Sequence, residues 1–334
     1  MINFRWHRFW SIFQARNREF YRDWGTLGWV FLFPILMVIA FGYIFNLDDN
    51  QIYKVAKSGT STLAVSEFFQ YIDVETADEG IEKLKKHRVD LYIEDDKVWM
   101  NDTSLKSKTA IKLLQAAGDD QPGFTVGKVD GQLVRYVDWL FPGILCLNIL
   151  WMSLWGVGWV IVRHRKLGIL KRFKASPVTA FEYLLAQMTS RMLVLILCGV
   201  MVFAGAYLLN PFPVEGRLLD LLIVYSMGCF CHAAIGLIIA ARMSSEELAN
   251  GILNLITYPF MFISEIWFSL EGSPDWVLGL AKLTPLWHMV DGMRRIMFEG
   301  AALSELWLGL VIFSAVTVIG LTIGSLAFRW NPES

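Results

Sequence analysis

Apolar stretches of about twenty residues constrain this chain more than any other feature, because a run of that length crosses a bilayer as a single helix. Hydrophobic residues make up 55% of the 334 positions and charged residues only 18%, with a mean hydropathy of +0.44. This balance argues against a soluble protein and predicts an α-helical polytopic membrane protein. Six transmembrane helices are expected, at 26–46, 136–162, 183–208, 218–241, 248–270 and 303–328.

A further segment, 274–299, is apolar in part but is interrupted by Pro285, Asp291, Arg294 and Arg295. Those residues make it too polar to cross the bilayer in full. We expect outer short or re-entrant helices there.

The orientation follows from the basic residues in short loops, since cytoplasmic loops retain Lys and Arg. With both termini inside, the inner segments hold thirteen basic residues and the short outer loops hold four. We therefore expect a multi-pass protein with both termini in the cytoplasm. The formal net charge of -1 provides no overall attraction for nucleic acid.

Residues 1–25 predict an amphipathic helix that lies along the inner face of the membrane. Aromatic side chains recur close to helical spacing, and arginines occupy the other faces. The interfacial aromatic residues are Trp6, Phe9, Trp10 and Phe13. The alternative, a helix packed on a protein core, has less support because the sequence contains no large cytoplasmic domain.

Residues 47–135 have a different character and predict a small extracytoplasmic α/β domain inserted between the first two transmembrane helices. Short strand-like runs (IYKVA, VDLYIE, KVWMN) alternate with helix-like ones (TADEGIEKLKKHR, SLKSKTAIKLLQAAG). The Gly-, Asp- and Pro-rich stretch 118–131 is expected to be the linker that returns the chain to the membrane.

Motifs for catalysis, metal binding or nucleotide hydrolysis are absent from the sequence. The four cysteines, Cys146, Cys198, Cys229 and Cys231, lie in apolar stretches without metal-ligand spacing, and the five histidines are scattered. No G-x-x-x-x-G-K-[ST] phosphate loop occurs. We expect no catalytic or metal site and no cofactor in this chain, so that any ATP hydrolysis belongs to another subunit.

The segment 163–182 carries six basic residues within twelve positions, interleaved with apolar ones, and is followed by Ser176 and Pro177. The charges alone could anchor the loop to anionic lipid, at about 1 kcal/mol per residue near the surface. The apolar interleaving instead predicts a short amphipathic helix that docks into a partner, with Pro177 in the first turn of the next transmembrane helix.

Three ordered blocks resemble the membrane subunit of ATP-binding-cassette exporters of the type-two permease class, which includes bacterial drug, lipid and polysaccharide exporters. The blocks are RNREFYRDWGTLGWVFLFPILMVIAFGYIFN at 16–46, the stretch from Gly168 to Pro177, and SPDWVLGLAKLTPLWHMVDGMRRIMFEG at 273–300. Trp24, Lys166 and Lys171 depart from the family pattern, the two lysines standing where acidic residues are common.

The resemblance implies a permease subunit in the bacterial inner membrane, paired with a second copy or a close relative over two cytoplasmic ABC ATPase subunits that bind ATP and magnesium. Its coupling helix would contact the ATPase. The residues expected there are Leu167, Gly168, Leu170, Lys171, Arg172, Phe173, Ser176 and Pro177.

Polar residues within or beside the spans are candidates for a substrate path or gate, because such groups are costly in lipid unless they face a cavity or a partner. They are Asn148, Asn254, Tyr258, Glu265, His288, Asp291 and Arg294. The two amides could equally join helices by hydrogen bonds. For Glu265 we expect either a role in the path or an ion pair with Arg294.

The function expected from these features is outward transport of a hydrophobic or amphiphilic substrate, such as a drug, a lipid or a glycan-lipid. One alternative is a membrane enzyme that acts on lipid headgroups through His288 and Asp291, although a capped interfacial turn explains that pair more simply. Another is a ligand-sensing membrane anchor.

Overall fold

A computed structural model describes residues 5–23, 25, 28, 31–37, 39, 53–58, 69–85, 88–94, 97–116, 124–130, 136–209, 211–271 and 273–331. The chain forms two compact units. A helical unit comprises Met1–Ala40, Leu140–Trp267 and Gly279–Ser334, and a second unit comprises Phe41–Trp139 and Phe268–Leu278. Much of the predicted first transmembrane helix, 26–46, lies outside the described residues.

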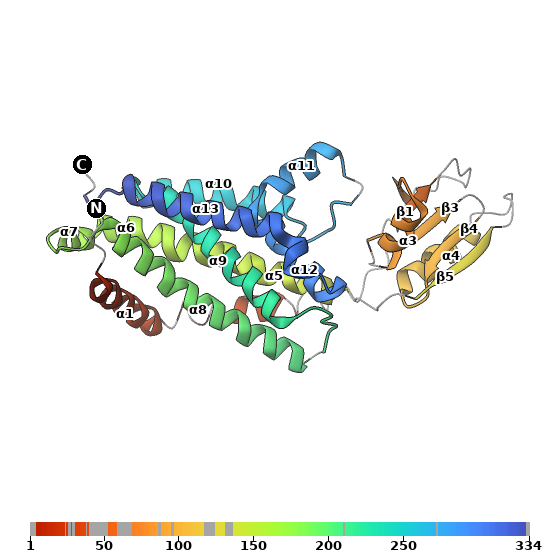
Figure 1. Cartoon of the computed structure of the whole chain (residues 1–334), viewed down its shortest axis with the longest axis horizontal. Helices are drawn as coiled ribbons and strands as arrows, with labels where there is room; N and C mark the ends of the chain where they lie inside the picture. Colours follow the sequence, from red (N-terminus) through yellow and green to blue (C-terminus); the bar gives the residue numbers. More distant parts are fainter. Residues whose placement is uncertain are drawn as a thin grey trace. The chain divides into compact units, whose positions relative to one another are not determined.

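Long helices that pack side by side, together with several shorter ones, build the helical unit (Figure 1). Their bounds are α1 Trp6–Arg22, α5 Tyr136–Ser153, the π-helix η1 Leu154–Trp159, α6 Val160–Lys166, α7 Ile169–Lys174, α8 Ala180–Leu209, α9 Leu218–Ala240, α10 Glu246–Ile263, α11 Asp275–Leu283, α12 Pro285–Glu299, the 3₁₀ turn η2 Leu303–Leu306 and α13 Trp307–Leu326.

Four helices among the described residues are long and apolar enough to cross a membrane: Tyr136–Lys166, Ala180–Leu208, Leu218–Ala240 and Leu303–Leu326. The predicted helix 248–270 is too long, because α10 ends at Ile263 after 18 residues. The chain turns there at Ser264, whose hydroxyl lies 3.3 Å from that of Thr284. Apolar composition continues beyond this turn, so composition alone could not locate the end of the helix.

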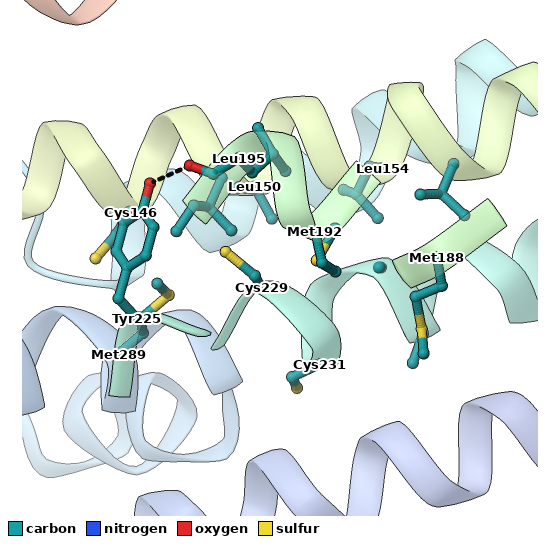
Figure 2. Packing of buried hydrophobic residues seen from close by; sticks show 14 of the residues in the cluster. Cys146, Leu150, Leu154, Met188, Met192, Leu195, Tyr225, Cys229, Cys231 and Met289 are labelled. Atoms are coloured by element: carbon teal, nitrogen blue, oxygen red, sulfur yellow. Dashed lines mark hydrogen bonds between the residues drawn. The ribbon is translucent and has the colours of Figure 1, made fainter. Parts of the chain in front are cut away.

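Helix α9 packs against α13, η1, α12 and α8. Its backbone comes very close to η1, since a Cβ atom on Gly158 would lie 3.0 Å from the carbonyl oxygen of Gly236. Further along α9, the Tyr225 hydroxyl donates to the Leu195 carbonyl oxygen at 3.4 Å, among buried Cys146, Cys229 and Met289 (Figure 2). Small residues and sulfur-containing side chains therefore allow the helices to pack closely.

One end of the helical unit collects the start of α1, all of α7 and the tail that follows α13 (Figure 1). The Arg5 amide donates to a Glu182 carboxylate oxygen at 2.6 Å, and the Arg329 amide donates to the Ala241 carbonyl oxygen at 3.0 Å. This end is called the α7 end below. Helices α11 and α12 follow the opposite end of α10 and occupy the segment predicted to hold short helices.

The second unit is a mixed five-stranded sheet with two helices. Its elements are β1 Tyr53–Ser58, β2 Phe69–Asp73, α3 Ala77–Lys85, β3 Leu91–Glu94, β4 Lys97–Asn101, α4 Leu105–Ala116 and β5 Thr125–Val129. The strand order is β2-β1-β3-β4-β5. Strand β1 is parallel to β2 and β3, β4 is antiparallel to β3, and β5 is parallel to β4.

Alternation along the strands gives this sheet two apolar faces. On β1, Val55 belongs to the core that includes Ile111 of α4, whereas Ala56 belongs to the core that includes Leu84 of α3. The expected linker at 118–131 is wrong in part, because it contains edge strand β5. Gly127 in that strand is required by packing, since a Cβ there would lie 2.4 Å from the Trp99 ring.

Candidate functional site

Helix α7 begins directly after a sharp break in the backbone. Gly168 has a φ of +71°, a left-handed conformation that glycine adopts without steric cost, and it separates α7 from α6. At the other end, the Ser176 hydroxyl donates to the Phe173 carbonyl oxygen at 2.7 Å. The six-residue helix is therefore fixed at both of its ends by local backbone geometry.

A capping box, not Pro177, starts the next helix. Helix α8 begins at Ala180, so Pro177 precedes it instead of lying in its first turn. The Glu182 amide donates to Thr179 Oγ1 at 3.2 Å, and the Thr179 amide donates to Glu182 Oε2 at 2.8 Å. The T-x-x-E spacing at 179–182 was visible in the sequence and would have predicted this N-terminus.

The apolar side of α7 is buried within this chain. Leu170 is 0% exposed and belongs to the main core of the helical unit. The Phe173 ring lies 5.2 Å from the Tyr183 ring, which also contacts Phe328 and Trp330. These apolar residues, which were expected to dock into a partner, pack within the chain instead, because α8 and the tail after α13 cover them.

The opposite side of α7 is exposed and basic. Lys171, Arg172 and Lys174 are exposed, and Leu167 is 61% exposed. Pro177 is also exposed, whereas Gly168 and Ser176 are half-buried. Of the residues predicted to contact an ATPase, Leu167, Lys171, Arg172 and Pro177 are thus accessible, and Leu170 is not.

Helix α1 packs on α8 through one face. Phe9 and Phe13 are buried, so the expectation that all four aromatic residues face lipid is wrong for these two, while Trp6 and Trp10 remain exposed. Arg8 donates to the Pro177 carbonyl oxygen and lies 3.9 Å from the Glu182 carboxylate. The membrane helices themselves supply the core on which this helix packs.

The π-helix η1 presents a backbone carbonyl to two arginines. The Gly156 carbonyl oxygen accepts from Arg16 of α1 at 3.3 Å and from Arg191 of α8 at 3.1 Å. The Arg191 guanidinium also lies 4.5 Å from the centre of the Phe20 ring. Insertion of a π-helical turn changes the regular helical hydrogen bonding, and here side chains from two other helices bond to the widened turn.

A polar network connects α1, α6 and α8 next to this carbonyl. Arg16 lies 2.5 Å and His164 lies 3.6 Å from the Glu19 carboxylate, and the His164 ring lies 3.2 Å from the Tyr183 hydroxyl. The interaction with His164 and the nearby charge of Arg16 outweigh partial burial and lower the pKa of Glu19 from 4.5 to about 2. This network was not predicted from the sequence, because its members lie far apart along the chain.

The amides and Tyr258 of the predicted substrate path lie on α5 and α10. Asn148 is buried, Asn254 is half-buried and Tyr258 is 49% exposed. The Tyr258 ring is 6.2 Å from that of Trp151. Trp151 stacks in turn on Trp155, whose indole N–H donates to Asn250 Oδ1 at 3.0 Å. This aromatic and amide surface, formed by Trp151, Trp155, Asn250, Asn254 and Tyr258, is called the α5/α10 surface below.

Glu265 lies in the turn after α10 and not within a transmembrane helix as expected. Its φ of +56° is rare for a residue with a side chain. Arg294 is buried, and its guanidinium donates at 3.3 Å to the carbonyl oxygen of Ile266, the residue that follows Glu265. Arg294 thereby holds the turn that carries Glu265, through the backbone.

His288 and Asp291 both lie on α12 but have separate partners. The His288 ring donates to the Lys282 carbonyl oxygen at 2.8 Å, and burial lowers the pKa of His288. The Asp291 carboxylate lies 3.9 Å from the Arg295 guanidinium. Both contacts suit a capped interfacial turn. In the part of the chain that the structure describes, no group of three or more His, Cys, Asp or Glu side chains could hold a metal ion.

The fold and the α7 end define a class of protein: a polytopic helical membrane protein in which a short helix between two spans presents a basic face and is fixed to the bundle by its apolar face. Residues 94–298 match the ABC-2 type transporter family. The match covers more than half of the chain, and the chain belongs to that family.

Several curated proteins are similar to this chain. The inner membrane transport permease YhhJ of Escherichia coli (strain K12) is 22% identical over 192 residues, which cover 57% of this chain and 51% of that protein. ABC transporter G family member 20 of Dictyostelium discoideum is 23% identical over 203 residues, or 60% of this chain and 28% of that protein. The daunorubicin resistance ABC transporter permease protein DrrB1 of Streptomyces coeruleorubidus is 22% identical over 193 residues, or 55% of this chain and 66% of that protein.

The chain thus spans about half the length of the first curated relatives it matches. The family and the names of the relatives confirm the predicted resemblance to an ABC transporter permease and agree with the expectation that the chain is not an enzyme.

Proposed function

We propose that this chain is the transmembrane subunit of an ATP-driven exporter and that a separate cytoplasmic ABC ATPase subunit binds ATP and magnesium. The observation that best supports this function is that α7 has two different sides. Its basic side, with Lys171 and Arg172, is exposed, whereas Leu170 anchors it in the bundle. A partner that moves the exposed side therefore moves the transmembrane helices, as a switch driven by differential contacts requires.

The proposed arrangement places the α7 end and both chain termini in the cytoplasm of a bacterial cell and the α/β unit outside the inner membrane. The asymmetry of basic residues supports this orientation. A second copy or a close relative completes the membrane part. Exposed Trp6 and Trp10 on α1 are suited to the lipid interface, because amphipathic aromatic side chains favour that region.

A hydrophobic or amphiphilic substrate fits the α5/α10 surface best. Indole and phenol rings provide flat apolar contacts, and the amides of Asn250 and Asn254 can orient a polar group. One relative is named for daunorubicin resistance, which supports this class. Glu265 and Arg294 form the proposed outer gate, because Arg294 bonds to the turn in which Glu265 lies.

Co-purification of the ATPase tests this function. Replacing Lys171 and Arg172 together by Glu should abolish capture of the cellular ABC ATPase and leave membrane insertion intact. Arg217→Glu is the matched control, since Arg217 is an exposed basic residue that directly precedes α9 and lies away from α7. Survival of the complex in the double variant would show that this helix does not hold the ATPase.

Cysteine labelling tests the orientation separately. The four native cysteines are buried, so introduced ones can be distinguished. An impermeant maleimide should label Lys106→Cys in intact cells and Lys171→Cys after permeabilisation alone. The opposite result would reverse the proposed topology.

A further inference from the structure

Arg165 is the last arginine of α6 and is almost fully buried, at 1% exposed. It lies three residues before the left-handed Gly168, in the last turn of α6, and this junction between α6 and α7 is called the root of α7 below. A buried guanidinium is costly unless its N–H groups are hydrogen-bonded. The acceptors of those N–H groups therefore show which parts of the chain Arg165 connects.

The guanidinium donates to backbone carbonyl oxygens of two other elements. Its Nη1 donates to Ala240 at 2.8 Å and to Met243, its Nη2 donates to Ala241 at 2.9 Å, and its Nε donates to Arg329 at 2.8 Å. Ala240 is the last residue of α9, Ala241 and Met243 follow directly after it, and Arg329 belongs to the tail after α13. The guanidinium also lies 5.4 Å from the centre of the Phe328 ring.

This arrangement uses two properties of the end of a helix. The last carbonyls of a helix have no intrahelical N–H partner, and they carry the negative end of the helix dipole. A planar guanidinium presents several N–H groups in a fixed geometry and can bond to several of these carbonyls at once, which a lysine ammonium on a flexible stem cannot do with the same geometry.

From these contacts we infer that Arg165 is a positioning residue that fixes the root of α7 to the end of α9 and to the tail after α13, so that these elements move as one body. The far side of α7 is attached separately to α8, through Phe173 and Tyr183. Displacement of α7 by a bound ATPase would then reach three helices together. That last step rests on the proposed function, whereas the fixed geometry does not.

The geometry can be measured without an ATPase or a substrate. Spin labels on cysteines introduced at exposed Ala175, directly after α7, and exposed Arg242 after α9 report the distance between these elements in the purified full chain, in lipid nanodiscs. We expect one narrow distance peak in the otherwise unchanged chain. Arg165→Gln should lose that single peak, and Arg165→Lys should lose it as well because a single ammonium cannot replace the guanidinium.

Arg163→Gln is the matched control, because Arg163 lies two residues before Arg165 on the same helix and is exposed. Its guanidinium lies 5.2 Å from the centre of the Trp159 ring. The Arg163→Gln variant should keep the narrow peak. An unchanged peak in both Arg165 variants would overturn the inference, and so would equal broadening by Arg163→Gln. If Arg165→Gln fails to yield folded protein, the Arg165→Lys variant, which retains the charge, provides the decisive comparison.

A second measurement separates this inference from the proposed function. With the co-purified ATPase and a non-hydrolysable ATP analogue with magnesium, the peak should stay in place in the parent chain, because α7 and α9 move together. In Arg165→Lys the broadened distance distribution should move to a different mean distance, because α7 then moves without α9. A nucleotide-induced shift in the parent chain would overturn the inference. If no ATPase co-purifies at all, the proposed function fails and the nanodisc measurement still decides the role of Arg165.

Discussion

Leu167 and Leu170 are the same residue type three positions apart, yet their surroundings are opposite. Leu170 is 0% exposed and Leu167 is 61% exposed. Truncation of each to alanine therefore compares the loss of a core side chain with the loss of a surface side chain in the same short segment. We expect Leu170→Ala to destabilise the chain and Leu167→Ala to have little effect.

The magnitudes follow from burial. Removing a buried leucine side chain costs about 2–5 kcal/mol, from lost burial and the cavity left behind, whereas a surface substitution changes the free energy of unfolding by less than about 0.5 kcal/mol. Leu170→Asp adds an unpaired carboxylate in the core, at a further cost of several kcal/mol. Against a total stability of about 5–15 kcal/mol, Leu170→Asp should prevent the accumulation of folded protein.

Thermal stability of the purified chain, measured by loss of the monodisperse peak in size-exclusion chromatography after heating, tests the comparison. Leu167→Asp should elute and melt like the parent chain but capture less ATPase, because Leu167 lies on the exposed side of the α7 segment. Equal melting temperatures for Leu170→Ala and Leu167→Ala would refute the burial of Leu170 and, with it, the division of α7 into two sides.

Three further variants test other contacts of the helical unit. A hydrogen bond to His164 on α6 lowers the pKa of Glu19 from 4.5 to about 2. The ionised Glu19 carboxylate therefore stabilises the chain fully above pH 4.5, and this contribution is lost as the pH falls toward 2. Glu19→Gln should flatten that part of the pH dependence of the melting temperature. Thr179→Ala should cost about 0.5–2 kcal/mol through loss of the helix cap, with Thr322→Ala on an exposed face of α13 as a nearly neutral control. Gly158→Ala should cost about 1–3 kcal/mol because its methyl group would meet a carbonyl oxygen of α9 at 3.0 Å, whereas Gly205→Ala, with open space around it, should not lower the melting temperature.

The sequence correctly indicated those features that depend on neighbouring residues. The apolar runs at 136–162, 183–208, 218–241 and 303–328 coincide with the four membrane-length helices among the described residues. Strand-like and helix-like runs in 47–135 likewise correspond to β1, β3, β4, α3 and α4.

Errors arose where a boundary depends on a distant contact. The end of α10 at Ile263 depends on the turn held by Ser264 and Thr284, and β5 depends on the fit of Gly127 beneath Trp99. Neither contact changes the local composition from which a span or a linker is predicted. The Thr179 capping box is a different kind of error, since its signal was present in the sequence.

The sequence by itself determined that the chain spans a membrane, that it lacks its own ATPase motif and that it resembles a type-two permease. The tertiary structure alone decided which side of α7 is free, which arginines are buried and what those arginines bind. Arg165 and Arg163 are indistinguishable in a charge count, yet one bonds to the ends of two other elements and the other is exposed. The reason is physical: the free energy of a buried charge depends on acceptors that lie 75 to 164 positions away along the chain, and only the folded arrangement brings those acceptors to it.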